Sequence, residues 1–209
     1  MTIDTKNMIN SIMDSISRID YIKPEDLPNI DLYMDQVTTF MESQLASTKR
    51  YPDDKILTKT MINNYAKNNL LPSPEKKRYS KEHLLLLIFI YYFKNILSIS
   101  DIQTLLSPIT EKYFKSAGEK DLTYIYNEVF SMEKSQIEYL KKDLLKRYHA
   151  AEDTFSEANE EDQDFLKKFS FICLLSFDVY VKKMLIEQLI DEMRPEDDGK
   201  KHRKEKTKK

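Results

Sequence analysis

The chain has 209 residues, 41% of them hydrophobic, and a formal net charge of −2. Its two glycines, Gly118 and Gly199, stand far apart, so the glycine clusters of phosphate-cradling loops and dinucleotide-binding turns are absent. This disfavours most enzymes that are built on tight strand-to-helix turns. Strand-like alternation is scarce, and the helix formers Leu, Lys, Glu and Met are plentiful, which predicts an all-α fold.

The first two predicted helices cover residues 2–17 and residues 31–45. The first is amphipathic, and the second can be capped by Asn29 or Asp31. A polar, basic turn over residues 47–54 follows the second helix.

A third helix is predicted over residues 58–68. Asn69 is expected to end it, because asparagine tolerates the left-handed backbone conformation that follows many helices. Residues 76–79 then form a short extended segment, and Ser80 caps the next helix.

The fourth helix, over residues 81–97, is apolar nearly all round and should therefore be buried on more than one side. The sequence from Ser98 to Asp101 resembles a capping box and begins a fifth helix that runs to residue 117. Pro108 is expected to kink or split this fifth helix.

The C-terminal half is predicted to contain two long helices. An amphipathic stretch over residues 122–155 slips its register by one at residues 136–137. A polar loop over residues 156–164 precedes the last helix, residues 165–193, and residues 194–209 form a charged, disordered tail.

No secretion or membrane signal is visible. The polar start of the chain does not resemble a signal peptide, and the lone Cys173 favours a reducing compartment. The apolar runs 83–93 and 169–181 are shorter than the ~20 residues of a membrane-spanning helix. We expect a cytoplasmic protein that does not enter the membrane, with both runs buried and Cys173 in the core.

Charge is strongly segregated along the chain. Residues 47–81 carry nine basic and three acidic side chains, a net of +6, whereas residues 1–46 carry three and eight, a net of −5. Residues 82–120 balance at four against four, residues 121–193 carry nine basic and sixteen acidic side chains, a net of −7, and the tail has +4. A compact basic block in an acidic protein is typical of a phosphate-facing surface, and a merely solvated lysine-rich face is the alternative.

The basic block contains a helix that could enter a major groove. The helix over residues 58–68 should bury Met61, Ile62 and Tyr65. Asparagine can read adenine with two hydrogen bonds, and lysine can contact phosphates. The polar side chains expected on its outer face are Lys59, Asn63, Asn64 and Lys67.

The stretch Leu57–Leu106 resembles the DNA-binding domain of the MerR family of transcriptional regulators. The matching words, in chain order, are Met-Ile-Asn-Asn-Tyr (61–65), Asn-Leu-Leu-Pro (69–72), Lys-Arg-Tyr-Ser (77–80) and Leu-Ser-Ile-Ser-Asp-Ile (97–102). Over most of its length the chain also resembles the bacterial family called domain of unknown function 1836, for which Leu-Thr-Lys-Thr-Met-Ile-Asn-Asn-Tyr (57–65) is typical.

The MerR resemblance implies a helix-turn-helix followed by a short basic wing. By position, Asn63 falls where that family often has a contacting arginine, Tyr65 matches an aromatic residue, and Lys77 matches the arginine of the wing. The chain departs from the pattern in three ways: Asn69 replaces a glycine, the wing is short, and the turn between the first two helices is longer. The implied DNA-contacting residues are Lys59, Asn63, Asn64, Tyr65, Lys67, Lys76, Lys77 and Arg78.

These observations predict a non-enzymatic DNA-binding transcriptional regulator whose partner is double-stranded DNA. Residues 1–30 would form an N-terminal helix and linker, residues 31–118 the DNA-binding domain, and residues 119–193 a region for homodimerisation or for an unknown effector. In one alternative these C-terminal helices pack back on the same chain. In another, the protein is a helical protein-interaction module that does not bind DNA.

No catalytic, cofactor or metal site is expected. No arrangement of Ser, His and Asp suits nucleophilic catalysis. The three histidines lack the spacing of metal ligands, both to one another and to the cysteine: His83, His149 and His202.

Overall fold

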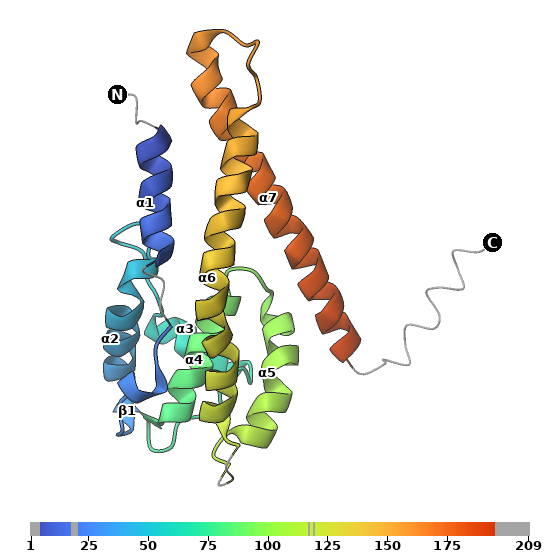
Figure 1. Ribbon diagram of the computed structural model, residues 1–209. Coiled ribbons are helices and arrows are strands. Elements are labelled where there is room, and N and C mark those ends of the chain that lie inside the picture. The colour runs from blue at the N-terminus through green and yellow to red at the C-terminus, as the bar shows by residue number, and fades with distance from the viewer. Residues whose placement is uncertain (1–4, 18–20, 117, 119, 195–209) are drawn as a thin grey trace, which may run out of the picture.

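In the computed structural model, short helices surround one central helix, and a long helical hairpin projects from this group (Figure 1). The structure describes residues 5–17, 21–116, 118 and 120–194. Over these residues the fold is all-α apart from one pair of two-residue strands. In chain order, the elements are α1 (Thr5–Ser17), η1 (Pro24–Asp26), β1 (Leu32–Tyr33), α2 (Met34–Leu45), η2 (Ala46–Thr48), α3 (Lys59–Lys67), β2 (Arg78–Tyr79), α4 (Lys81–Phe93), α5 (Ile99–Tyr113), α6 (Leu122–Glu152) and α7 (Glu160–Met193).

Helix α4 forms the centre of the core, as its sequence predicts. Every residue from His83 to Tyr91 is buried, and the cluster around them draws in side chains from α2, α3, α5 and α6. The helix ends at Phe93, earlier than the predicted Leu97. A turn after Phe93, in which Leu97 N donates to Phe93 O (2.9 Å), lets Leu97 fold back into the core.

Helix α3 agrees closely with its prediction. The hydroxyl of Thr58 accepts a hydrogen bond from Met61 N (3.2 Å), which caps the first turn. After the helix, Asn69 has a φ of 55°, the left-handed conformation expected of a residue that follows a helix end. Leu70 N then donates to Tyr65 O (2.9 Å), and the side chain of Leu70 is buried.

The start of α2 differs from the prediction because Leu32 and Tyr33 form a strand. They pair antiparallel with Tyr79 and Arg78, so the helix begins at Met34. Neither Asn29 nor Asp31 caps it; the side chain of Gln36 reaches back, and its Oε1 accepts from Tyr33 N (2.8 Å). Strands of two residues carry no periodic signal in a sequence, so this pairing was not predicted.

Helix α5 starts as predicted and continues through Pro108. Asp101 N donates to Ser98 Oγ (3.1 Å), and Ser98 N donates to Asp101 Oδ2 (3.2 Å), which completes the capping box. The predicted split at Pro108 does not occur: Leu106 is buried and Ile109 packs on the core, so tertiary contacts hold both sides of the proline. The helix ends at Tyr113 instead of residue 117.

The C-terminal half is an antiparallel hairpin of α6 and α7. Helix α6 is continuous through the predicted register slip, and the loop between the helices is shorter than predicted, because α7 begins at Glu160. The acidic residues in the first turn of α7, which the sequence interpretation assigned to the loop, suit the positive end of a helix. Helix α1 packs against this hairpin around the buried side chains of Ile9, Ala151 and Phe171.

The main core extends beyond residues 31–118 on both sides. Leu27 enters it from the N-terminal segment, and Leu122 and Phe130 enter it from the first half of α6. The hydroxyl of the fully buried Tyr126 donates to Ile22 O (2.7 Å), a bond that ties these flanking segments together. The first turns of α6 therefore belong structurally to the unit around α4.

The predicted burial of the run 169–181 on α7 is wrong. Among the residues described on α7, only Phe171 and Ile190 are buried, and Cys173 is exposed instead of lying in the core. The inner side of α7 packs on α6 and α1, while its outer side has no covering within the described chain (Figure 1). In the described ranges, no helix combines the length and apolar character needed to cross a membrane. The predicted tail lies outside the described residues after Arg194.

Candidate nucleic-acid interface

The junction between β1 and α2 connects the start of α3 to the segment predicted as a wing. The guanidinium of Arg78 stacks over the ring of Tyr33, with its carbon 5.3 Å from the ring centroid, and Arg78 Nε donates to Tyr33 Oη (3.3 Å). Two residues further along, Asp35 forms an ion pair with Lys59. Because Tyr33 and Asp35 are neighbours on one segment, the start of α3 and the base of the wing flank the same junction.

The outer face of α3 presents amide and ammonium groups, as predicted. Asn63, Asn64 and Lys67 are exposed, and Ile62 lies against the core. The side chain of Tyr65 is only 7% exposed, and burial raises the pKa of its phenol. Tyr65 therefore supports α3 from the core side, in a position where its ring cannot reach a ligand on the outer face.

The wing is a tight hairpin turn whose tip is formed by two lysines. Lys76 and Lys77 have φ values of 48° and 65°, and Arg78 N donates to Glu75 O (2.8 Å) across the turn. Positive φ at both central residues is the pattern of type I′ turns, which favour Asn and Gly. Side chains other than these rarely adopt this conformation without strain, and strained residues cluster at functional sites. The prediction of an extended segment holds for Arg78 and Tyr79 only.

The charges around the wing leave its tip positive. Glu75 pairs with Lys115, which lowers the pKa of the Glu75 carboxyl and raises that of the Lys115 ammonium. Among the described residues, no carboxylate pairs with Lys67, Lys76 or Lys77. The charge of the one acidic residue in the turn is thus offset by Lys115, and the two lysines at the tip remain available to a polyanion.

A buried histidine lies directly behind the wing. His83 is 1% exposed, and its ring stands edge-on to Tyr79 and Phe114, with centroids 5.5 and 4.9 Å away. Its Nδ1 accepts from Ser80 N (2.9 Å) at the start of α4, while its Nε2 has no hydrogen-bond partner within the described chain. Burial lowers the pKa of the imidazole, so the ring is neutral at pH 7. Its place three residues after Ser80, as in a capping box, is the sequence signal that could have predicted this role.

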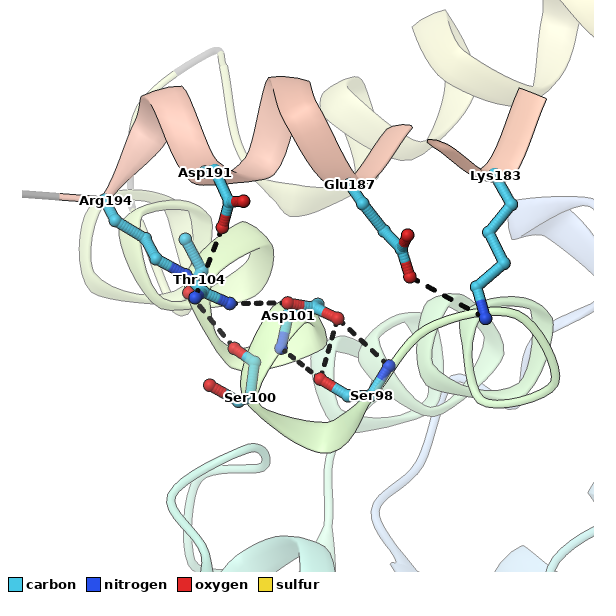
Figure 2. Close-up of polar contacts among 8 residues, drawn as sticks. All are labelled: Ser98, Ser100, Asp101, Thr104, Lys183, Glu187, Asp191 and Arg194. Carbon is cyan, nitrogen blue, oxygen red and sulfur yellow. Dashed lines mark hydrogen bonds and ion pairs between the residues drawn. The ribbon is translucent and has the colours of Figure 1, made fainter. Parts of the chain in front are cut away.

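An ion pair connects the C-terminal end of α7 to the start of α5. Figure 2 shows Arg194 beside Asp101, with Nη2 2.5 Å from Oδ1, while Oδ2 of Asp101 accepts from the hydroxyl of Ser98 (2.7 Å). One carboxylate thus serves both the helix cap and the ion pair, and Ile190 is buried one turn away. The sequence interpretation missed this contact, because 93 positions separate its two partners.

A groove of about 550 Å³ lies along α6, between α1 and α4. Its volume is in the range of small-molecule sites. However, Met132 and Tyr139 in its wall are exposed to solvent, so the groove does not enclose a ligand on that side. No group of three or more His, Cys, Asp or Glu residues in the described ranges is placed to hold a metal ion. The groove is lined by Ile16, Tyr92, Val129, Met132, Gln136, Ile137, Tyr139, Leu140, Asp143 and Lys182.

The described residues define an all-α protein in which a small two-stranded antiparallel sheet lies beside α2 and α4. Residues 22–129 match the family model described as "Domain of unknown function (DUF1836)". This match covers more than half of the chain, and the chain belongs to that family. Its limits extend beyond residues 31–118 on both sides, as the core does, and include Leu27 and Tyr126. Neither a curated protein nor a solved structure matches the chain.

Proposed function

We propose that this protein is a non-enzymatic, DNA-binding transcriptional regulator. It places the outer face of α3 in the major groove of duplex DNA and the tip of the wing on the adjacent backbone, as in a winged helix-turn-helix. The observation that carries the proposal is the β1–α2 junction, where Tyr33 holds Arg78 and Asp35 holds Lys59. Through these contacts, the start of α3 and the base of the wing are both attached to the same short segment.

Each exposed group has a chemical task in that complex. The amides of Asn63 and Asn64 can accept from and donate to an adenine edge, which gives sequence discrimination. Lys67, Lys76 and Lys77 can neutralise phosphates, which gives affinity without sequence preference. Lys59 is already paired with Asp35, so its main task is to hold the junction.

The charge distribution and the resemblance to the MerR domain support the same orientation. The block 47–81, with a net of +6, contains α3 and the tip of the wing, whereas residues 121–193 have a net of −7. An acidic helical hairpin is repelled by DNA, which leaves the basic side to face the duplex. Regulators of this kind usually bind two half-sites as two-fold dimers, and we include a homodimer in the proposal.

Charge reversal at the wing tip tests the proposal. We expect the double variant Lys76→Glu, Lys77→Glu to bind a duplex DNA probe at least about tenfold more weakly. The slope of log affinity against log salt should fall by about two, since each phosphate contact contributes about 0.9. Fluorescence anisotropy with a mixed-sequence duplex at several salt concentrations measures both quantities. Arg78 is left intact because it anchors Tyr33.

The matched control reverses two exposed lysines on α6, Lys142→Glu and Lys146→Glu. The control has the same change in net charge and should keep most of the affinity. Equal losses of affinity in both variants would mean that the effect comes from net charge alone. Unchanged DNA binding by the wing variant would contradict the assignment of the wing. Circular dichroism checks that both variants remain helical.

One observation favours the alternative, a protein-interaction module without DNA binding: the exposed outer side of α7. Under that alternative the wild-type protein would bind no duplex DNA even at low salt. Recovery of bound DNA from the native host, followed by sequencing, would identify the operator under our proposal and return only background under the alternative.

A further inference from the structure

The outer side of α7 carries an unusually large apolar surface. Monomeric proteins rarely expose contiguous apolar patches larger than a few hundred Å². Between Phe165 and Met184, seven large apolar side chains of this helix are between 41% and 68% exposed: Phe165, Phe169, Ile172, Phe177, Val179, Tyr180 and Met184. A fully exposed large side chain presents about 200 Å², so together these residues present roughly 700–800 Å². A standard interface buries about 800 Å² per partner.

Four of these exposed residues follow a coiled-coil spacing. Phe165, Phe169, Ile172 and Val179 lie on one stripe with Ser176, in steps of three and four residues. Steps of three and four keep side chains on the seam between two paired helices. The spacing therefore fits a partner helix lying along α7.

We propose that the partner is α7 of a second copy of this chain, paired antiparallel about a two-fold axis between Ile172 and Cys173. In this register, Phe165 lies opposite Tyr180 of the second copy, and Phe169 lies opposite Ser176 of the second copy. Along the seam, the ring of Phe165 would thus face another flat ring, and the ring of Phe169 would face a small side chain. The inference specifies the dimer included in the proposed function, and it does not depend on DNA binding.

The charged residues at the two ends of the stripe favour the antiparallel direction. Asp162, in the acidic first turn of α7, lies on the same stripe as Lys183 at the other end of the apolar surface. The proposed register places Asp162 opposite Lys183 of the second copy, and the two-fold axis produces this pair twice. A parallel pair in register would instead oppose Asp162 to itself and Lys183 to itself, which is unfavourable.

The chain supplies its own probe for this interface. Cys173 is its one cysteine, it is exposed, and it would lie next to the two-fold axis. We expect a short bis-maleimide at micromolar protein concentration to convert the wild-type chain into a covalent dimer. The Cys173→Ser variant should give none.

Sedimentation of matched variants then tests the register. The chain mass is 24.9 kDa, and we expect the wild type to sediment at about twice this mass. Ile172→Asp should give a monomer. Leu185→Asp, at an exposed position of the same helix away from the stripe, should remain dimeric. Circular dichroism confirms that both variants are helical.

A charge exchange tests the direction. Asp162→Lys alone and Lys183→Asp alone should each weaken the dimer, and the two together should restore it. A monomeric wild type at tens of micromolar would overturn the inference. So would a dimer that Ile172→Asp leaves intact or that Cys173 fails to cross-link. The variant Lys76→Glu, Lys77→Glu should still dimerise, so a failure of this interface and a failure of DNA binding are distinguishable.

Discussion

Helices α4 and α7 are both rich in apolar residues, but the chain covers only one of them. From Leu84 to Tyr91 every side chain of α4 is buried, whereas α7 buries Phe171 and Ile190 and leaves aromatic side chains such as Phe165 exposed. The difference shows that an apolar run in a sequence does not by itself predict burial within the same chain.

The ionisable residue in each apolar run shows the same contrast. His83 on α4 is neutral and buried among rings. Asp178 on α7 is charged and lies between Lys182 (2.7 Å) and Arg147 of α6 (3.2 Å), and chiefly the hydrogen bond from Lys182 lowers the pKa of its carboxyl. A charge can stay at Asp178 because two cations pair with it and its side chain keeps partial contact with water.

The largest expected effect comes from emptying the core beside α4. We expect Leu87→Ala to lower the free energy of unfolding by about 2–5 kcal/mol, the range for removing a fully buried leucine. The matched change Leu189→Ala, on the exposed side of α7, should lower it by no more than about 0.5 kcal/mol. Urea unfolding followed by circular dichroism measures both. Similar losses in the two variants would contradict the contrast between the helices.

The free energy of unfolding should depend on pH through the protonation of His83. Its pKa is lowered in the folded state, so its contribution to stability is complete above its ordinary value of 6.5 and is lost as the pH falls below it. One proton can account for at most about 1.4 kcal/mol per pH unit. Unfolding curves at pH 7.5, 6.5 and 5.5, roughly spanning that range, should show this loss.

The variant His83→Gln provides the control, because glutamine can accept from Ser80 N at the same helix position. It should lose less stability than the wild type between neutral pH and pH 5.5. The carboxyl of Asp178, whose pKa is lowered below 3.8, should contribute nothing in this range. Parallel curves for the wild type and His83→Gln would contradict the role of His83.

The smallest effect concerns the ion pair at the end of α7. Arg194→Ala should cost about 0.2–1 kcal/mol, because this pair is partly exposed to solvent. Asp101→Ala should cost more, about 1–2 kcal/mol, since it also removes the hydrogen bonds that the carboxylate accepts from the backbone N and the hydroxyl of Ser98 in the capping box. The double variant should cost less than the sum of the two single losses. Additive losses would mean that Arg194 and Asp101 do not interact in solution.

Local signals in the sequence predicted most of the unit around α4. Thr58 and Ser98 start helices as their cap positions indicate, Asn69 ends α3, and the uninterrupted apolar run of α4 is buried. These features depend on residues that are close together in the chain. The exposed asparagines and lysines of α3 were predicted for the same reason, from helical spacing alone.

Features that depend on distant residues were not predicted. The pairing of Tyr33 with Arg78 creates the wing and shortens α2, and no pattern within either short segment indicates it. Helical spacing did predict the burial of Tyr65, and this burial contradicts the DNA contact that the MerR resemblance implied for the same residue. Cys173 resembled a core residue because its neighbours are apolar, yet the tertiary arrangement turns that side of α7 outward.

The length of α7 would set the distance between two DNA-reading units. The helix has 34 residues, and Ile190, where it enters the main core, lies about 26 Å along the axis from the proposed two-fold point beside Ile172. In the antiparallel pair, the two cores would thus be anchored about 52 Å apart, which exceeds the ~35 Å of one DNA turn. We therefore expect an inverted repeat whose half-sites are separated by more than one turn, with a central stretch of DNA that neither copy of α3 touches.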